Sequence, residues 1–363
     1  MSEQAILEDV FFVTLYGGVT LLNAAAAVYL LLRRGNAFAP EVTSPIRLRH
    51  WAAAFLLACA LSHLMWLLYV RHPSLTAYVT VCGLDILLYI PTIAGSLLAM
   101  LQDRHRAVWP VAVALVPAVV LTVLSIIRND DALFVPLSVY VVSLYALFML
   151  YIFHAVRRYG RWLRDNYADL EHKEIWQSLL ILAVFLLFFI VYSSTTTERV
   201  YLYLLQIDNI LIVGILLWRA ETLQQLAESE PAVAEPADDL QKPSAQPVIP
   251  ANIGPQLKKH CEDRRLYLQH DLNLAQLAQV IGTNRYYLSQ HFAQQGLTYN
   301  AYINGLRIRH FIRLYQAAVT EQRTVTARQL AYESGFHSYS TFGAAFKQSM
   351  GTTVTAWMHS AAE

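Results

Sequence analysis

The chain has 363 residues, of which 56% are hydrophobic and only 15% charged, and its net charge is +1 at pH 7. This composition is too apolar for an ordinary pair of soluble domains, and the length favours more than one domain. Because the apolar excess lies almost wholly before residue 220, the sequence predicts two regions of different character.

Seven apolar runs precede residue 220, and each is long enough to cross a bilayer core of ~30 Å as a helix of about 20 residues. The first run follows an acidic flank and is too long for the apolar part of a signal peptide, so we expect an uncleaved helix. The runs are Val10 to Leu32, Trp51 to Val70, Leu75 to Leu101, Ala107 to Ile127, Ala132 to Val156, Ile175 to Thr197 and Tyr201 to Trp218.

Basic residues are distributed unevenly between the loops that join these runs. Eleven Arg and Lys residues follow the first, third and fifth runs, whereas the alternate loops carry three. Because positively charged loops stay on the cytoplasmic side, we expect the N-terminus outside and the C-terminus in the cytoplasm. The outside loops are short, so no external sensor domain is predicted.

Residues 227–251 are rich in proline, alanine and acidic residues and show no apolar periodicity. We expect a flexible acidic linker between a transmembrane region, residues 1–226, and a C-terminal domain, residues 252–363. Just before the linker, Leu216, Leu223 and Leu226 fit either the start of a homodimer seam or a helix end along the inner membrane surface.

One short pattern occurs twice in the C-terminal domain. Each copy consists of a Leu-Ala pair, a glycine and two apolar residues four positions apart, and it predicts a helix, a tight turn and a second helix. This is the spacing of a helix-turn-helix, which lays its second helix in a DNA major groove. Residues Tyr299 to Ala318 predict one long helix that joins the copies. The repeated positions are Leu277-Ala278, Gly282, Leu288 and Phe292, then Leu330-Ala331, Gly335, Phe342 and Phe346.

The segment from about Ile253 to Trp357 resembles the DNA-binding domain of AraC/XylS-type bacterial transcription regulators. The stretches that carry this resemblance are "LNLAQLAQVIGTNRYYLSQHFAQQGLTYNAYINGLRI" and "TVTARQLAYESGFHSYSTFGAAFKQSMGTTVTAW". It implies an all-α cytoplasmic domain with two helix-turn-helix units that binds double-stranded promoter DNA. The sequence departs from the family at Val354, where proline is usual, and at Gly343 and Ala344, where serine and arginine are frequent.

Helical periodicity separates core positions from those available to DNA. By resemblance Tyr286, Ser289 and Gln290 occupy base-facing positions, and Gln290 can bond adenine through two hydrogen bonds. From residue 252 onward, eleven Lys and Arg residues against six Asp and Glu give +5, which favours the DNA phosphates. The predicted DNA-binding residues are Asn284, Arg285, Tyr286, Ser289, Gln290, Tyr339, Ser340 and Lys347.

Ionisable residues inside a bilayer are costly, so each is a candidate for function. His63, Asp85 and Asp208 lie within the second, third and seventh runs, at depths of about 10 to 15 Å from the outer ends. They fit a site where a small molecule, a cation or a proton is read. They also fit hydrogen-bonded links that hold the helices together.

These observations predict an all-α protein: a bundle of seven transmembrane helices in a bacterial inner membrane, fused to a cytoplasmic AraC-type domain. The function predicted is a membrane-anchored one-component transcription regulator that answers to a small-molecule or protein signal. No catalytic constellation, glycine-rich phosphate loop or zinc-ligand spacing stands in the sequence, so we expect no enzyme, cofactor or metal. Two alternatives stay open: a transporter or membrane enzyme with a fused autoregulatory domain, and a constitutive DNA–membrane anchor.

Overall fold

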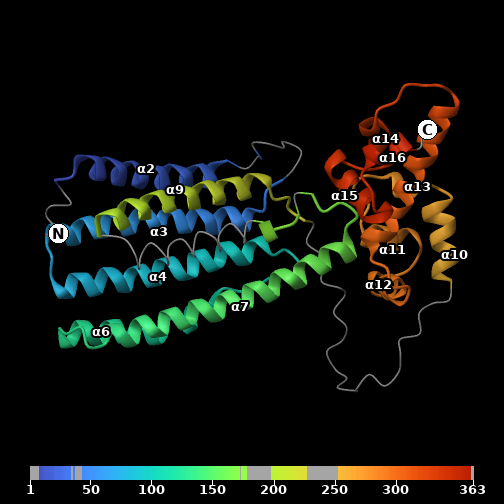
Figure 1. Ribbon diagram of the computed structural model, residues 1–363. Coiled ribbons are helices and arrows are strands. Elements are labelled where there is room, and N and C mark those ends of the chain that lie inside the picture. Colours follow the sequence, from blue (N-terminus) through green and yellow to red (C-terminus); the bar gives the residue numbers. More distant parts are fainter. Residues whose placement is uncertain are drawn as a thin grey trace, which may run out of the picture. The chain divides into compact units, whose positions relative to one another are not determined.

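The computed structural model describes residues 8–33, 36, 43–171, 173–177, 198–226 and 252–360. Within these residues the regular elements are helices and no β-strand is present, which confirms the all-α prediction. The chain divides into two compact units (Figure 1). The first consists of Met1–Tyr159 and His172–Glu230, and the second of Gly160–Glu171 and Pro231–Glu363. The predicted linker, residues 227–251, lies outside the described residues.

The first unit contains the long apolar helices. They are α2 (Val10–Leu32), α3 (Ile46–Arg71), α4 (Leu75–Met100), α5 (Trp109–Ala114), α6 (Val116–Arg128), α7 (Phe134–Asn166) and α9 (Glu198–Thr222). Helix α7 begins in the first unit, and its last residues, from Gly160 on, belong to the second. Six stretches of the described residues are long and apolar enough to cross a membrane, with α5 and α6 counted as one.

These six stretches coincide with six of the seven predicted runs. The sixth run, Ile175 to Thr197, falls almost wholly outside the described residues, so the count of seven stays a prediction. The fourth run was predicted as one helix, but the structure divides it at Leu115 into α5 and α6. Pro117 lacks the backbone N–H that would continue the hydrogen-bond ladder there.

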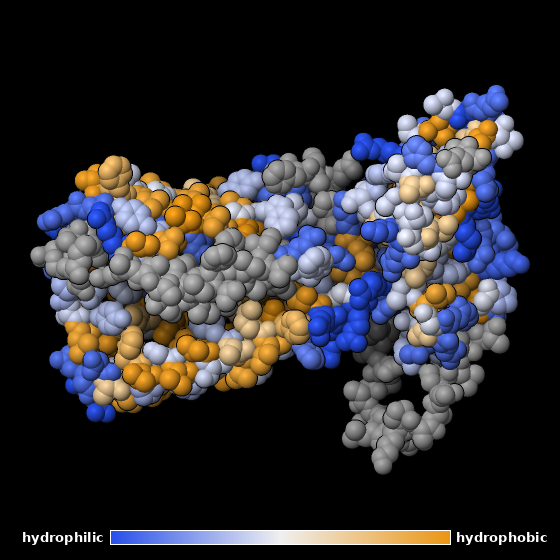
Figure 2. All heavy atoms as spheres, in the orientation of Figure 1, coloured by the Kyte–Doolittle hydropathy of each residue, from blue (hydrophilic) through white to orange (hydrophobic). Residues whose placement is uncertain are grey.

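Helix α3 packs against both α2 and α4 and also contacts α9. Small side chains allow this, since Ala52 and Ala53 of α3 are fully buried. The outward side chains are also apolar: Leu147 and Leu150 of α7 are 65% and 66% exposed. Figure 2 shows hydrophobic residues gathered on the surface of these helices. An apolar surface of this kind is costly in water and is matched by lipid.

The second unit contains shorter helices. They are α10 (Ile253–Leu257), a π-helical turn η1 (Lys258–Glu262), a 3-10 turn η2 (Leu266–Leu268), α11 (Leu274–Val280), α12 (Arg285–Gln294), α13 (Tyr299–Thr320), α14 (Ala327–Glu333), α15 (Tyr339–Met350) and α16 (Val354–Ser360). Helix α13 is the long joining helix that was predicted from Tyr299 to Ala318.

Two apolar cores form in the second unit, one around each pair of helices that the repeat predicts. The first contains Leu277, Leu288 and Phe292, and the second contains Leu330, Phe342 and Phe346. Helix α13 supplies residues to both, with Tyr299, Ile303 and Leu306 in the first core and Ile308, Phe311 and Tyr315 in the second. Because one helix buries side chains in both cores, the two pairs are joined by packing as well as by the chain.

Candidate nucleic-acid interface

The first helix pair, α11 and α12, is built by local signals in the sequence. Gly282 in the turn has a φ of +73°, a conformation that costs glycine little. The side chain of Asn284 caps α12 by accepting a hydrogen bond from the Tyr287 backbone N–H at 2.9 Å. Leu288 and Phe292 are buried, as the helical period predicted.

The second pair, α14 and α15, repeats this construction. Gly335 has a φ of +90°, and Ser338 caps α15 by accepting from the Thr341 backbone N–H at 3.2 Å. Phe342 and Phe346 are fully buried. Five residues, 334–338, separate α14 from α15, against four, 281–284, between α11 and α12. The second turn is therefore one residue longer, as the sequence spacing predicted.

The predicted DNA-binding residues all lie on α12, on α15 or at a helix cap. Tyr286 is 55% exposed and Tyr339 is 37% exposed, so each presents an aromatic ring with a hydroxyl to solvent. Asn284, Ser340 and Lys347 are exposed too, whereas Arg285, Ser289 and Gln290 are half-buried. The second helix of each pair thus carries hydrogen-bonding side chains on its outward face, which is the arrangement that reads a major groove.

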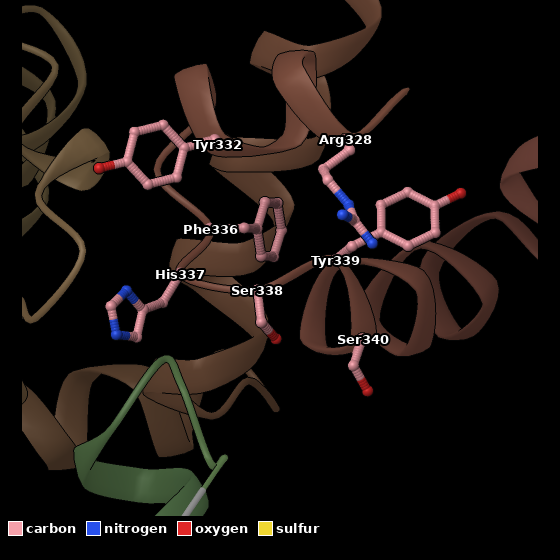
Figure 3. Close-up of a pocket in the computed structure, with 7 residues that line it drawn as sticks. All are labelled: Arg328, Tyr332, Phe336, His337, Ser338, Tyr339 and Ser340. Atoms are coloured by element: carbon pink, nitrogen blue, oxygen red, sulfur yellow. The ribbon is translucent and has the colours of Figure 1, made fainter. Parts of the chain in front are cut away.

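A hollow beside the start of α15 contains residues that the sequence prediction did not include. It is lined by Arg328, Tyr332, Phe336, His337, Ser338, Tyr339 and Ser340. Arg328 reaches from α14 toward the ring of Tyr339 (Figure 3). A guanidinium next to a helix N-terminus suits a phosphate oxygen. Arg328 could have been included from its place in the sequence, because it is a basic residue in the exposed first turn of α14.

Arg307 was counted among the basic residues available to DNA, but the structure shows that it is not available. Its side chain is fully buried, and it donates hydrogen bonds to the carbonyls of Tyr267 at 2.8 Å and Gln269 at 2.6 Å. Burial lowers the pKa of Arg307 to about 10, which still leaves it charged at neutral pH. Arg307 therefore holds the chain between η2 and α11 in place, and its charge does not face solvent.

This geometry is that of a helix-turn-helix domain. Residues 277–360 match a family model described as "Helix-turn-helix domain", and this domain is of the AraC type. The match runs from α11 to α16 and so includes both helix pairs. A search of curated proteins and of solved structures finds no match to the chain. The C-terminal region therefore contains a helix-turn-helix domain of the AraC type, and it follows an apolar helical region.

His63, the first candidate in the apolar helices, lies where α2 meets α3. Its ring stacks on Tyr16 with the ring centres 4.4 Å apart, and its Nδ1 lies 3.0 Å from the hydroxyl of Thr20. The Tyr16 hydroxyl donates to the backbone carbonyl of His63 at 2.7 Å. These contacts link α2 to α3 through polar groups.

Asp85 and Asp208 lie at other contacts of the first unit. Asp85, on α4, accepts a hydrogen bond from Nε1 of Trp66 at 2.7 Å. Because Trp66 is three residues after His63 on α3, both links lie on one face of that helix. Asp208 is half-buried on α9, next to Asn209, whose side-chain oxygen accepts from Asn23 at 2.8 Å. Among the described residues no group of three His, Cys, Asp or Glu side chains could hold a metal ion.

Proposed function

We propose that this protein is a membrane-anchored, one-component transcription regulator that binds promoter DNA through α12 and α15. The observation that carries the proposal is the doubled unit itself. Each copy has a capped second helix with an outward polar face, and α13 packs into both cores. A rigid connection of this kind holds two reading helices at a fixed spacing, as two successive major grooves ~34 Å apart require.

The two reading helices differ in what they offer to bases. Helix α12 carries Tyr286, Ser289 and Gln290, which can donate or accept hydrogen bonds at base edges. Helix α15 has Gly343 and Ala344 in its middle, and neither side chain can form a hydrogen bond with a base. We therefore assign most base recognition to α12, and mainly backbone contacts to Ser340, Lys347 and Arg328 on the second pair.

The membrane location is supported by the six apolar stretches and by the apolar surface of α7. The distribution of Arg and Lys along the chain favours an outside N-terminus and a cytoplasmic C-terminus, in the inner membrane of a bacterium. In that orientation the DNA-binding domain lies in the compartment that holds DNA.

Selection of bound sequences tests the DNA-binding part of the proposal. Full-length protein in lipid nanodiscs is mixed with random-sequence duplexes at about 0.1 M salt, and the enriched sequences are then footprinted. We expect two protected stretches about one helical turn apart, and much weaker protection of a scrambled duplex. Equal binding to both duplexes would exclude a sequence-specific regulator and would favour a protein that merely anchors DNA to the membrane.

We further propose that the polar links around His63 and Asp85 respond to the signal. Hydrogen bonds inside a bundle are sensitive to ligand, cation or proton binding because no water replaces a lost partner. A reporter gene behind the selected operator is compared between the natural protein and Asp85→Asn, Asp208→Asn and His63→Gln variants. Asp131→Asn, an exposed loop change, is the control. We expect the three bundle variants to alter reporter output while the amount of regulator protein stays normal, and we expect the control to leave output unchanged. Unchanged output in all three bundle variants would mean that these residues have a structural role only.

A further inference from the structure

The second unit includes a short segment from a distant part of the sequence, Gly160–Glu171. Its backbone is held by α13: Nδ2 of Asn300 donates to the carbonyl of Ala168 at 2.7 Å, and Nδ2 of Asn304 donates to the same carbonyl at 3.0 Å. The Ala168 side chain is buried in the core of the first helix pair. Tyr167 also forms an isolated antiparallel bridge with Asn273, the cap of α11. Side-chain clamps on the backbone and a buried residue fix this segment in place.

Two carboxylates of this segment lie at the N-terminus of α15. The hydroxyl of Thr341 donates to Oδ1 of Asp169 at 3.1 Å and is 3.2 Å from Oε2 of Glu171. The hydroxyl of Ser338, the cap of α15, also donates to Oε2 of Glu171. Asp169 is only 7% exposed. A helix N-terminus favours negative charge because its free N–H groups and its dipole point toward the anion.

The same segment also contacts the first residue of α12. The guanidinium of Arg285 lies 5.8 Å from the centre of the Trp162 ring, within the range of a cation–π interaction. Burial lowers the pKa of Arg285, as expected for a guanidinium drawn partly out of water. One segment therefore touches the beginning of both helices that we assign to DNA reading.

A helix-turn-helix presents these same first-turn residues to DNA, where hydroxyls and backbone N–H groups bind phosphate oxygens. A carboxylate offers such donors the same kind of acceptor as a phosphate. We propose that Asp169 and Glu171 substitute for DNA phosphates at the N-terminus of α15, so that the segment Gly160–Glu171 and DNA compete for one surface. The segment is an autoinhibitory element, and this role rests on the DNA binding proposed above.

The position of this segment in the chain connects a candidate membrane span to the proposed competition with DNA. Gly160–Asn166 is the end of α7, which is one of the six candidate membrane spans. The chain runs without a break from that span to Asp169 and Glu171. A change in the packing of the span can therefore move these two carboxylates directly, and the signal does not have to pass through the predicted linker. An equilibrium between covered and free α15 is shifted by any signal that favours one of the two states.

The test compares DNA affinity between matched variants of the full-length protein in nanodiscs. The probe is a mixed-sequence duplex of about four helical turns, and anisotropy gives the apparent Kd. We expect Asp169→Asn/Glu171→Gln to bind roughly tenfold more tightly than the natural protein, a typical size for coupling between sites. The control is Asp165→Asn/Glu174→Gln, which removes two negative charges from the same stretch but none of the carboxylates at α15. We expect its Kd to change little.

A second variant tests the segment without altering charge. Asn300→Ala/Asn304→Ala removes the side chains that hold the backbone of Tyr167 and Ala168, and we expect it to raise DNA affinity as well. In both variants, amide hydrogen exchange without DNA should become faster in the first turn of α15 and stay unchanged in the last turns of α13, which lie away from the two substituted positions. Equal affinity of the natural protein, both variants and the control overturns the autoinhibition and leaves DNA binding intact. Absence of DNA binding in every protein overturns the proposed function itself.

Discussion

Gln290 and Lys347 lie on different reading helices and differ in what they can recognise. Gln290, on α12, presents an amide that can pair with adenine, whereas Lys347, in the last turn of α15, offers only a positive charge. We expect Gln290→Ala to relax sequence preference at one base pair by about 1–3 kcal/mol. Lys347→Ala should weaken binding to all sequences alike and lower the salt slope by about 1. Titrations of selected and scrambled duplexes at several salt concentrations measure both effects.

The control for Gln290→Ala is Gln294→Ala, which makes the same change one turn later on α12. In a helix-turn-helix the N-terminal residues of the second helix contact the bases, so this control should leave sequence preference unchanged. If Lys347→Ala alters preference more than Gln290→Ala does, base recognition lies mainly on α15, and our assignment of the two helices is reversed.

At the scale of elements, the two turn glycines occupy equivalent places but have different surroundings. A Cβ added to Gly282 would meet nothing within 4 Å, whereas one added to Gly335 would lie 2.8 Å from Cα of Leu268. Both glycines have positive φ, which costs any other L-residue about 1–2 kcal/mol. We therefore expect Gly282→Ala to destabilise by about that amount and Gly335→Ala by about 3 kcal/mol or more, since the backbone of η2 would have to move.

Native-state hydrogen exchange measures these costs in the full-length protein, with the α11 and α12 amides reporting on Gly282→Ala and the α14 and α15 amides on Gly335→Ala. Gly343→Ala is a control of opposite sign, because Gly343 lies inside α15 and a Cβ there would meet nothing within 4 Å. That change should stabilise α15 by about 0.5–1 kcal/mol. Equal destabilisation by Gly282→Ala and Gly335→Ala would mean that the contact with Leu268 does not constrain the second turn.

The elements that the sequence predicted correctly are those specified by local patterns. The repeat around Gly282 and Gly335 predicted both helix pairs, and the apolar period from Tyr299 predicted α13. What it did not predict depends on residues far apart in the chain. Ala168 packs with residues more than 80 positions later, and no local period reveals such a partner. For the same reason the charge count treated Arg307 as a surface cation, although it is fully buried.

At the scale of the whole molecule, the ends of the apolar helices bear on the predicted topology. Arg199, at the start of α9, forms an ion pair with Asp9, the cap of α2, at 2.5 Å. Thr76 at the start of α4 donates to Asn129 at the end of α6 at 3.0 Å, and Tyr78 lies near Phe134, the first residue of α7. Tyr16, in the first half of α2, contacts His63 in the second half of α3. Within the first unit, α2, α4, α7 and α9 therefore begin at one end.

Since α7 leads away from that end and α9 begins at it, we expect the predicted run Ile175 to Thr197 to cross the membrane between them. Single cysteines at Ala132, Arg161 and Glu198 test this with a maleimide that does not cross membranes, and the natural protein serves as background. We expect Ala132→Cys and Glu198→Cys to be labelled in intact cells, because the positive-inside distribution places both outside. Arg161→Cys should be labelled only after permeabilisation. If Ala132→Cys is labelled in intact cells and Glu198→Cys is not, the sixth run does not cross the membrane. If only Arg161→Cys is labelled in intact cells, the orientation is the reverse of the predicted one, and the DNA-binding domain does not lie in the cytoplasm.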